Sequence, residues 1–204
     1  MKLFYKPGAC SMAAHILLNE AGVDYQLEKV DTDAGTTENG ASYATTNPRG
    51  YVPALEFENG EILTENVAVL QWLSEQLPGF ASNDNGSSLV KFRQLELLSF
   101  LSSELHKAFN PYFSGKEFNA DEKAANSKKL NATISQFEVL LAKGGLYLLG
   151  DSFSVADAYA FVILNWTNFI GVSLADWPET EAYVTRIQTR PAAQQTLKEE
   201  GLAA

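Results

Sequence analysis

The chain contains one cysteine, Cys10, at a position where a thiol could do chemistry. Cys10 lies in Gly8-Ala9-Cys10-Ser11, directly before a segment with helical periodicity. The unpaired N–H groups and partial positive charge of a helix start lower the pKa of a thiol and stabilise its thiolate. We therefore expect Cys10 to be reactive, with Ser11 either capping the helix or donating its hydroxyl to a sulfur. The alternative is a buried, inert thiol. Without a second cysteine, intramolecular dithiol chemistry is excluded.

Two further segments could hold an extended, charged ligand. Val52-Pro53 precedes a short strand, and the free main-chain N–H and C=O of Val52 could pair with a peptide as an added strand. In Thr64-Glu65-Asn66, helix N–H groups and Asn66 could hold a carboxylate while Glu65 meets an ammonium. The alternatives are an ordinary trans edge proline and a plain helix start with an acid in its first turn.

His106 is the histidine that could serve a catalytic site. It adjoins an apolar stripe on a predicted helix, so we expect it to line a cleft, where its ordinary pKa near 6.5 would let it donate to or accept from a sulfur. A satisfied structural histidine is the alternative, and we assign that role to His15. Asp157, three residues after Ser154, is interpreted as half of a capping box rather than as a catalytic acid.

The elements that must position these residues follow a recognisable order. Residues 2–5 and 25–30 predict strands around a helix over 11–21, which Gly22 ends. Residues 54–58 and 61–64 alternate in polarity around Asn59-Gly60, which predicts a hairpin, and an apolar stripe over 67–77 predicts a helix. This is the thioredoxin-like order, in which the proline at position 53 is expected to be cis. Residues 36–50 are too polar to assign.

The second part of the chain is expected to be all-helical. Amphipathic patterns cover 89–109 and 130–141, and the nearly all-apolar segment 155–166 predicts a buried central helix. Residues 81–88 are small and polar and predict a linker. The fold class is therefore an α/β thioredoxin-like N-terminal domain over 1–80, followed by an all-α C-terminal domain over 89–204.

Composition excludes several kinds of function. The 204 residues carry a net charge of −10, which opposes binding to nucleic acid or to an anionic membrane. One cysteine and two histidines leave little for a metal site, so none is expected. The chain shows no signal peptide or membrane span, and we expect a soluble cytoplasmic protein.

Together these motifs resemble a bacterial glutathione S-transferase of the beta class, over essentially the whole chain. The motifs that carry the resemblance are Met1-Lys2-Leu3-Phe4-Tyr5, Pro7-Gly8-Ala9-Cys10-Ser11, Asn47-Pro48-Arg49-Gly50-Tyr51-Val52-Pro53-Ala54-Leu55, Leu63-Thr64-Glu65-Asn66, Ser103-Glu104-Leu105-His106-Lys107, Phe153-Ser154-Val155-Ala156-Asp157-Ala158-Tyr159 and Arg190-Pro191. The family implies glutathione as co-substrate, a helical domain that supplies most of the second-substrate site, and a homodimer.

The resemblance also assigns residues to the site. It implies that Cys10, with Ser11 and His106, acts on the glutathione sulfur, that Val52 beside Pro53 pairs with the cysteinyl backbone, and that Glu65 with Asn66 holds the γ-glutamyl end. From the helical domain, the implied binding residues are Ser99, Ser103, Glu104, His106 and Lys107.

The chain departs from the family at two positions. The lysine often found near position 35 is missing, since Ala34-Gly35-Thr36 stands there, and a common serine is Asn66. A ligand carboxylate would then depend on Lys107, on Arg49 or on backbone donors.

The implied mechanism is stabilisation of the glutathione thiolate for attack on a small hydrophobic electrophile in an apolar cleft, with Phe109, Tyr112, Phe113 or Trp166 as candidate contacts. Cysteine-based thiol–disulfide exchange, disulfide reduction and dehalogenation share the same motifs. A non-catalytic ligand carrier or regulatory adaptor of the same fold is the alternative from another class.

Overall fold

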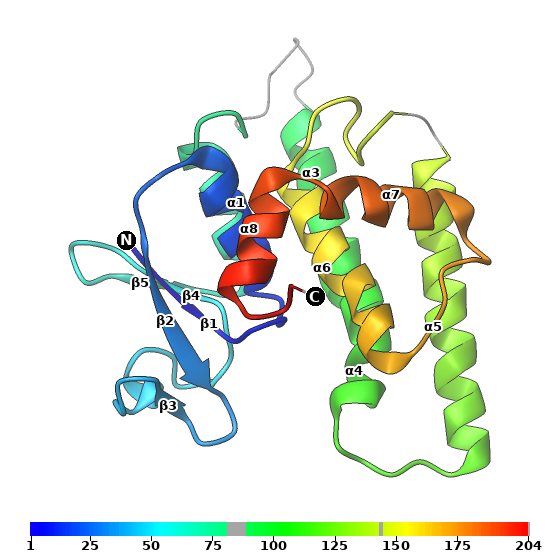
Figure 1. Cartoon of the computed structure of the whole chain (residues 1–204), viewed down its shortest axis with the longest axis horizontal. Coiled ribbons are helices and arrows are strands. Elements are labelled where there is room, and N and C mark those ends of the chain that lie inside the picture. Colours follow the sequence, from blue (N-terminus) through cyan, green and yellow to red (C-terminus); the bar gives the residue numbers. More distant parts are fainter. Residues whose placement is uncertain (81–88, 143–144, 204) are drawn as a thin grey trace.

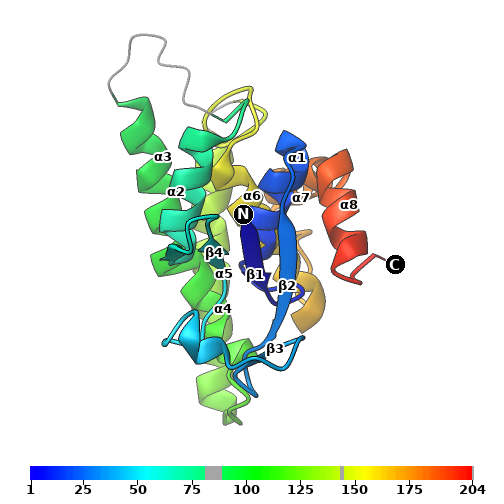
Figure 2. The same ribbon diagram turned by 90° about the vertical axis from the view of Figure 1, so that its left-hand side faces the viewer.

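The computed structural model describes residues 1–80, 89–142 and 145–203. Its N-terminal part is built on a five-stranded sheet in the order β3-β2-β1-β4-β5. The strands are β1 (Lys2–Tyr5), β2 (Gln26–Asp31), β3 (Thr36–Thr37), β4 (Ala54–Glu56) and β5 (Ile62–Thr64). Viewed from the sheet side, the helical part of the molecule lies behind these strands (Figure 2).

The pairing of the strands confirms the thioredoxin-like order. β1 runs parallel to β2 and antiparallel to β4, and β4 forms an antiparallel hairpin with β5. Parallel neighbours need a crossover, and here it is α1 (Met12–Ala21), which ends at Gly22 with a left-handed φ of 62°. Gly60 supplies the positive φ of the hairpin turn, 84°, as the Asn-Gly pair predicts. The helix α2 (Asn66–Gln76) then follows β5.

The rest of the described chain is helical, as expected. Its elements are α3 (Val90–Phe100), a π-helical turn η2 (Leu101–Leu105), α4 (His106–Phe113), α5 (Ala120–Leu141), α6 (Val155–Ile170), α7 (Pro178–Gln188) and α8 (Pro191–Glu199). In Figure 1, α6 stands between the sheet part and the outer helices. Every residue from Val155 to Thr167 is buried, which confirms the predicted central helix.

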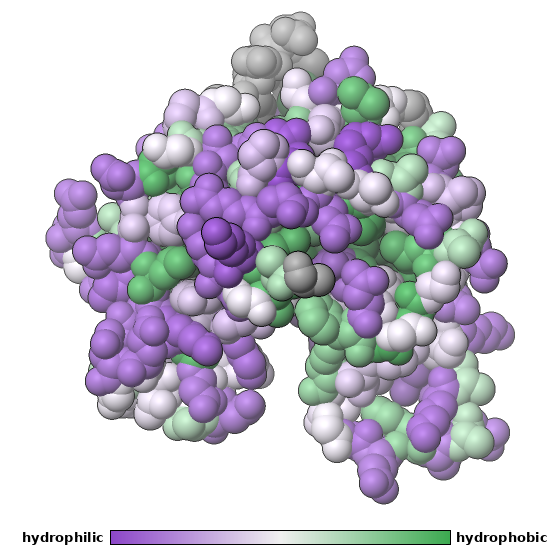
Figure 3. Space-filling model, in the orientation of Figure 1, coloured by the Kyte–Doolittle hydropathy of each residue, from purple (hydrophilic) through white to green (hydrophobic). Residues whose placement is uncertain are grey.

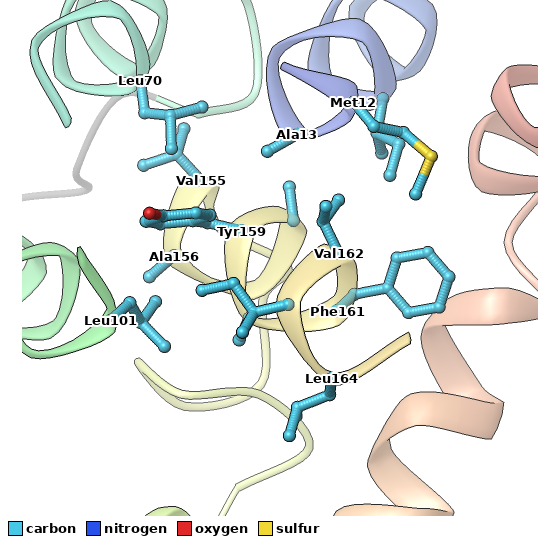
Figure 4. Close-up of a cluster of buried hydrophobic side chains, with 14 of the residues drawn as sticks. Met12, Ala13, Leu70, Leu101, Val155, Ala156, Tyr159, Phe161, Val162 and Leu164 are labelled. Carbon is cyan, nitrogen blue, oxygen red and sulfur yellow. The ribbon is translucent and has the colours of Figure 1, made fainter. Parts of the chain in front are cut away.

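The core continues from the helical part into the thioredoxin-like part. Tyr159 and Val162 of α6 share one buried cluster with Met12 and Ala13 of α1 and with Leu70 of α2 (Figure 4). Because the two parts bury apolar surface against each other, the loop that carries Cys10 is held in a fixed position over α6.

The start of α6 has the predicted capping box. Asp157 accepts hydrogen bonds from the Ser154 N–H at 2.8 Å and the Ser154 hydroxyl at 2.5 Å. It also accepts from the Leu148 N–H at 2.9 Å and the Tyr183 hydroxyl at 2.7 Å, two contacts that the sequence pattern does not reveal. Asp157 therefore acts in folding, as predicted, and joins three segments rather than one helix end.

His15 has the structural role assigned to it. Its ring is buried in α1, with Nε2 at 2.8 Å from Glu199 and Nδ1 at 2.8 Å from Glu200. The second carboxylate oxygen of Glu200 accepts the Gly8 N–H at 2.8 Å. The end of the chain thus anchors both α1 and the loop that precedes Cys10.

Three segments differ from the sequence predictions or lie beyond them. The unassigned residues 36–50 contain β3 and a short 3-10 turn, η1 (Tyr43–Thr45), whose Tyr43 is fully buried. The amphipathic run over 89–109 is interrupted by η2. The sequence does not predict this interruption, because a π turn leaves no mark in the apolar spacing. The predicted linker 81–88 lies outside the described residues, so its role and the domain boundaries stay predictions.

Candidate active site

Cys10 lies between β1 and α1, as predicted, but its neighbour Ser11 does not behave as expected. Ser11 occupies the N-cap position of α1 and makes no capping hydrogen bond. Its hydroxyl is fully buried, accepts the Lys6 N–H at 3.2 Å and donates to the Lys6 carbonyl at 3.3 Å. The expected cap is therefore wrong, because the hydroxyl closes the loop between residues 6 and 11, and a role toward a ligand sulfur stays a prediction.

The Cys10 thiol is not the low-pKa group that its position suggests. The N–H groups of Cys10 and Ser11 do lower its pKa, but burial outweighs them and raises the pKa of the thiol to about 12. The neutral thiol donates a hydrogen bond to the Val52 carbonyl at 3.3 Å. The sequence shows the helix start, whereas the strands and helices that bury the sulfur come from distant segments.

The Val52-Pro53 bond is cis, which confirms the prediction. The Val52 carbonyl is not free, since it accepts the Cys10 thiol. The Val52 N–H donates to no acceptor among the described residues, so one of the two expected main-chain groups is open to a ligand. Tyr51, immediately before it, is one of the most exposed aromatic side chains, at 72%.

The start of α2 presents a charged pair. Glu65 has a positive φ of 69°, an unfavourable conformation for a side chain that bears a Cβ, and strain of this kind clusters at functional sites. Its carboxylate pairs with Arg49 at 2.9 Å, and both side chains are exposed. An exposed pair of this kind contributes little to folding stability, so its charges can be redirected to a ligand.

Asn66 does not present its amide to solvent. Both amide atoms are inaccessible and have no hydrogen-bond partner among the described residues. Asn66 lies beside the hydroxyl of Tyr159 and lowers the pKa of that hydroxyl, which burial raises. The expectation that this amide meets a ligand carboxylate stays a prediction, and the open donors here are the first N–H groups of α2.

His106 lies at the start of α4 and faces α6, as a cleft-lining residue should. Its Nδ1 lies 2.7 Å from the Tyr159 hydroxyl, and its ring packs edge-on against Trp166 at 4.7 Å between centroids. Trp166 donates its indole N–H to the Gly8 carbonyl at 2.7 Å. The imidazole and the cysteine loop are therefore connected through one tryptophan.

The other residues assigned from the helical domain are exposed. Ser99, Ser103, Glu104 and Lys107 lie on α3, η2 and α4, and among the described residues none of their side chains bonds to the N-terminal part. The Ser99 hydroxyl donates to the Leu95 carbonyl at 2.7 Å. The structure thus leaves these four residues available but does not gather them around Cys10.

An apolar wall borders the site on the helical side. Phe109 and Phe113 of α4 pack edge-on against Trp166, and Phe113 and Tyr112 are partly or largely exposed. Phe169, at the end of α6, is 54% exposed and approaches Gly8. In Figure 3, a hollow separates the lobe of β3 and η1 from the lower ends of α4 and α5, and hydrophobic colours cover part of its inner surface on the α4 side.

Sequence reasoning missed two residues of this site. Tyr159 was seen only as part of a motif, and Glu200 was not singled out. A tyrosine two residues after the capping aspartate on an otherwise apolar helix is the signal that could have found Tyr159, since a buried hydroxyl needs a partner.

These features define a class of protein: a thioredoxin-like domain with one thiol at the start of its first helix, a cis-proline beside it and a helical domain that completes the site. The chain matches the sequence models of the glutathione S-transferase N-terminal domain over residues 8–76 and C-terminal domain over residues 100–191. It is 38% identical to glutathione S-transferase GstA of Escherichia coli O157:H7, covering 99% of this chain and 100% of that protein.

Solved structures agree with the sequence matches. A sphingomonad glutathione S-transferase complexed with glutathione is 43% identical, with a TM-score of 0.90 over the full length of both chains. The bacterial beta-class enzyme of Sphingomonas chungbukensis is 41% identical, again with a TM-score of 0.90 over both full chains. The chain belongs to the glutathione S-transferase family, and the predicted resemblance to the bacterial beta class is confirmed.

Burial gives His106 an unusual charge state. Desolvation, and then the charge of Lys107, lower the pKa of its imidazole to about 4, so the ring is neutral between pH 5 and 8 and the expected titration near 6.5 is wrong. In the unfolded chain His106 takes up a proton below about pH 6.5, whereas in the folded chain it does so only near pH 4. His106 therefore reduces the free energy of unfolding as the pH falls from about 6.5 to 4, by up to roughly 3 kcal/mol.

We predict that the ring signals of His106 in an NMR titration show a midpoint near pH 4. A His106→Gln variant identifies these signals by their absence, because the chain has only two histidines. Between pH 6.5 and 4, the free energy of unfolding measured in urea should fall less in this variant than in the native chain. A native midpoint above pH 6 would show that the ring is solvated and its pKa is not lowered.

Proposed function

We propose that the protein is a glutathione transferase that binds glutathione across the start of α1, the Val52 segment and the start of α2. The observation that carries the proposal is the meeting of three open features at one place. These are the helix start at Cys10, the N–H of Val52, which has no partner in the described part of the chain, and the exposed Glu65–Arg49 pair. Each matches one part of glutathione, namely its thiol, its cysteinyl backbone and its γ-glutamyl group.

The γ-glutamyl group carries an ammonium and a carboxylate on one carbon. Glu65 can accept the ammonium, while Arg49 and the first N–H groups of α2 can meet the carboxylate. The Arg49–Glu65 pair already places opposite charges 2.9 Å apart, so a ligand that carries the complementary pair can replace their mutual contact. Arg49 can thereby stand in for the lysine missing near position 35.

The glutathione sulfur would lie close to Cys10. The positive end of α1 lowers the pKa of a thiol placed there, and a larger thiolate fraction raises the rate of attack on an electrophile. Cys10 itself is neutral and can donate a hydrogen bond to that thiolate instead of attacking. A small hydrophobic electrophile would bind against Phe113, Phe169 and the neighbouring apolar wall.

Two further parts of the proposal concern the setting of the enzyme. A homodimer is proposed from the family, and a mass near twice 22.3 kDa by light scattering would support it, whereas a monomer at micromolar concentration would contradict it. A cytoplasmic location is proposed because reduced glutathione and an unpaired thiol both belong to a reducing compartment.

The charged pair at α2 provides the test of the proposed function. Calorimetry should show glutathione binding to the native protein, and Glu65→Gln should weaken it roughly tenfold, because one charge-assisted hydrogen bond is lost. Glu96→Gln is the matched control, since Glu96 pairs with Arg93 at 2.7 Å and is exposed to 62%, against 66% for Glu65. No binding of glutathione at millimolar concentration, or equal losses in both variants, would remove the proposed site.

A further inference from the structure

The hydroxyl of Tyr159 is the one polar group that α6 directs at His106. Tyr159 is 1% exposed, and its hydroxyl lies 2.7 Å from His106 Nδ1. Asn66 is the other polar side chain beside this hydroxyl and lowers the pKa of Tyr159, but among the described residues its amide has no hydrogen-bond partner of normal geometry. The contact between tyrosine and histidine is therefore the hydrogen bond that satisfies the buried hydroxyl.

Counting protons across this contact determines which group donates. The neutral imidazole carries one N–H, on either Nδ1 or Nε2. If Nδ1 carried it, Nδ1 would donate to the tyrosine oxygen, and the only acceptor left to the Tyr159 proton would be Asn66 Oδ1, which has no hydrogen-bond partner of normal geometry among the described residues. If Nε2 carries it, Tyr159 donates to Nδ1 and both groups are satisfied. Since an unsatisfied buried donor is costly, the second arrangement should be favoured by roughly tenfold or more.

The remaining contacts of His106 are ring contacts with α6. The ring is held edge-on by Trp166, and its centroid lies 6.0 Å from that of Tyr159 at an interplanar angle of 74°. Nε2 has no hydrogen-bond partner among the described residues. The π turn η2 ends immediately before His106, and such turns are frequent at functional sites.

We propose that Tyr159 is a positioning residue, which donates its hydroxyl proton to His106 Nδ1 and so keeps the imidazole as the Nε2–H tautomer, aimed at the sulfur of bound glutathione. The sulfur as target rests on the proposed function, whereas the tautomer does not. In this role Nε2–H donates a hydrogen bond to the thiolate and keeps its proton. The proton that glutathione loses goes to solvent.

The first test is the tautomer in the free protein. NMR of the chain labelled with ¹⁵N-histidine reports which ring nitrogen carries hydrogen, and the two histidines make assignment simple. We expect the native His106 to be protonated at Nε2 alone, and Tyr159→Phe to show a mixture of both tautomers. Tyr25→Phe is the matched control, because it removes a hydroxyl near His15 and should leave the His106 signals unchanged.

The second test links the tautomer to chemistry. Thiolate absorbance against pH gives the pKa of bound glutathione, which we expect to rise by about one unit in Tyr159→Phe, equivalent to a tenfold loss of thiolate. The same substitution made in His106→Ala should have no further effect, because the two residues act as one unit. A purely structural role for Tyr159 would instead give additive losses.

Three results would overturn the proposal. These are a native His106 protonated at Nδ1, a tautomer unchanged in a folded Tyr159→Phe, and an effect of Tyr159→Phe that persists without His106. The first result is measured on the native chain, so it tests the proposal even if Tyr159→Phe does not fold. Failure of glutathione to bind would contradict the proposed function and leave the tautomer result unaffected.

Discussion

Replacing Asp157 by alanine should lower the free energy of unfolding by roughly 4 kcal/mol. The carboxylate is completely buried and accepts from Leu148, Ser154 and Tyr183. Alanine leaves these donors buried without an acceptor, and each unsatisfied group costs about 1–3 kcal/mol. Urea unfolding followed by circular dichroism measures the loss, which should appear as a large fall in the denaturation midpoint.

A second capping box in the same chain is a matched control. At the start of α5, Asn119 accepts the Glu122 N–H at 2.9 Å and Glu122 accepts the Asn119 N–H at 3.0 Å, but on the surface. Glu122→Ala should therefore cost no more than about 1 kcal/mol, because water can replace the lost bonds. Equal losses at the two boxes would show that Asp157 contributes only as a helix cap and that its contacts to Leu148 and Tyr183 add nothing.

The sequence was a good guide to features set by neighbouring residues. The hairpin at Gly60, the end of α1 at Gly22 and the box at Ser154 and Asp157 each depend on residues within a few positions, and each is confirmed. The buried helix over 155–166 was also clear, because an apolar surface all round the helix has no exposed face. These features follow from local conformational preferences and from hydrophobicity.

The errors arise where distant segments meet. The one local error is at Ser11, whose hydroxyl bonds to Lys6 instead of capping α1. The pKa values of Cys10 and His106 were expected from local charge and from ordinary values, whereas burial decides both. Burial of a site depends on which remote elements pack over it, and the period of hydrophobic residues does not reveal that.

The raised pKa of Cys10 distinguishes the roles of the two sulfurs in the proposed reaction, that of Cys10 and that of glutathione. A thiol whose pKa is raised to about 12 is a poor nucleophile at neutral pH, so we expect the sulfur that attacks an electrophile to be that of glutathione. We expect the start of α1 and His106 to act on it, and thiol exchange through Cys10 to be the slower of the two reactions.

The rate at which Cys10 reacts with iodoacetamide should fall roughly fiftyfold on folding. Raising the pKa from 9.0 to about 12 lowers the thiolate fraction at pH 7.5 by about three orders of magnitude. The greater intrinsic nucleophilicity of a more basic thiolate recovers part of that loss, about half on a logarithmic scale. The unfolded chain in urea is the matched control, because it contains the same single thiol without its burial.

Mass spectrometry can follow both this reaction and the one with oxidised glutathione, since one cysteine permits one adduct per chain. In the exchange, the Cys10 thiolate attacks one sulfur of the disulfide and releases a glutathione thiolate, so burial should slow this step as well. Cys10→Ala should abolish the adduct and reduce conjugation only partly, because α1 and His106 remain. A native thiol that reacts as fast as the unfolded one would show that the helix start outweighs burial, and would restore Cys10 as a nucleophile.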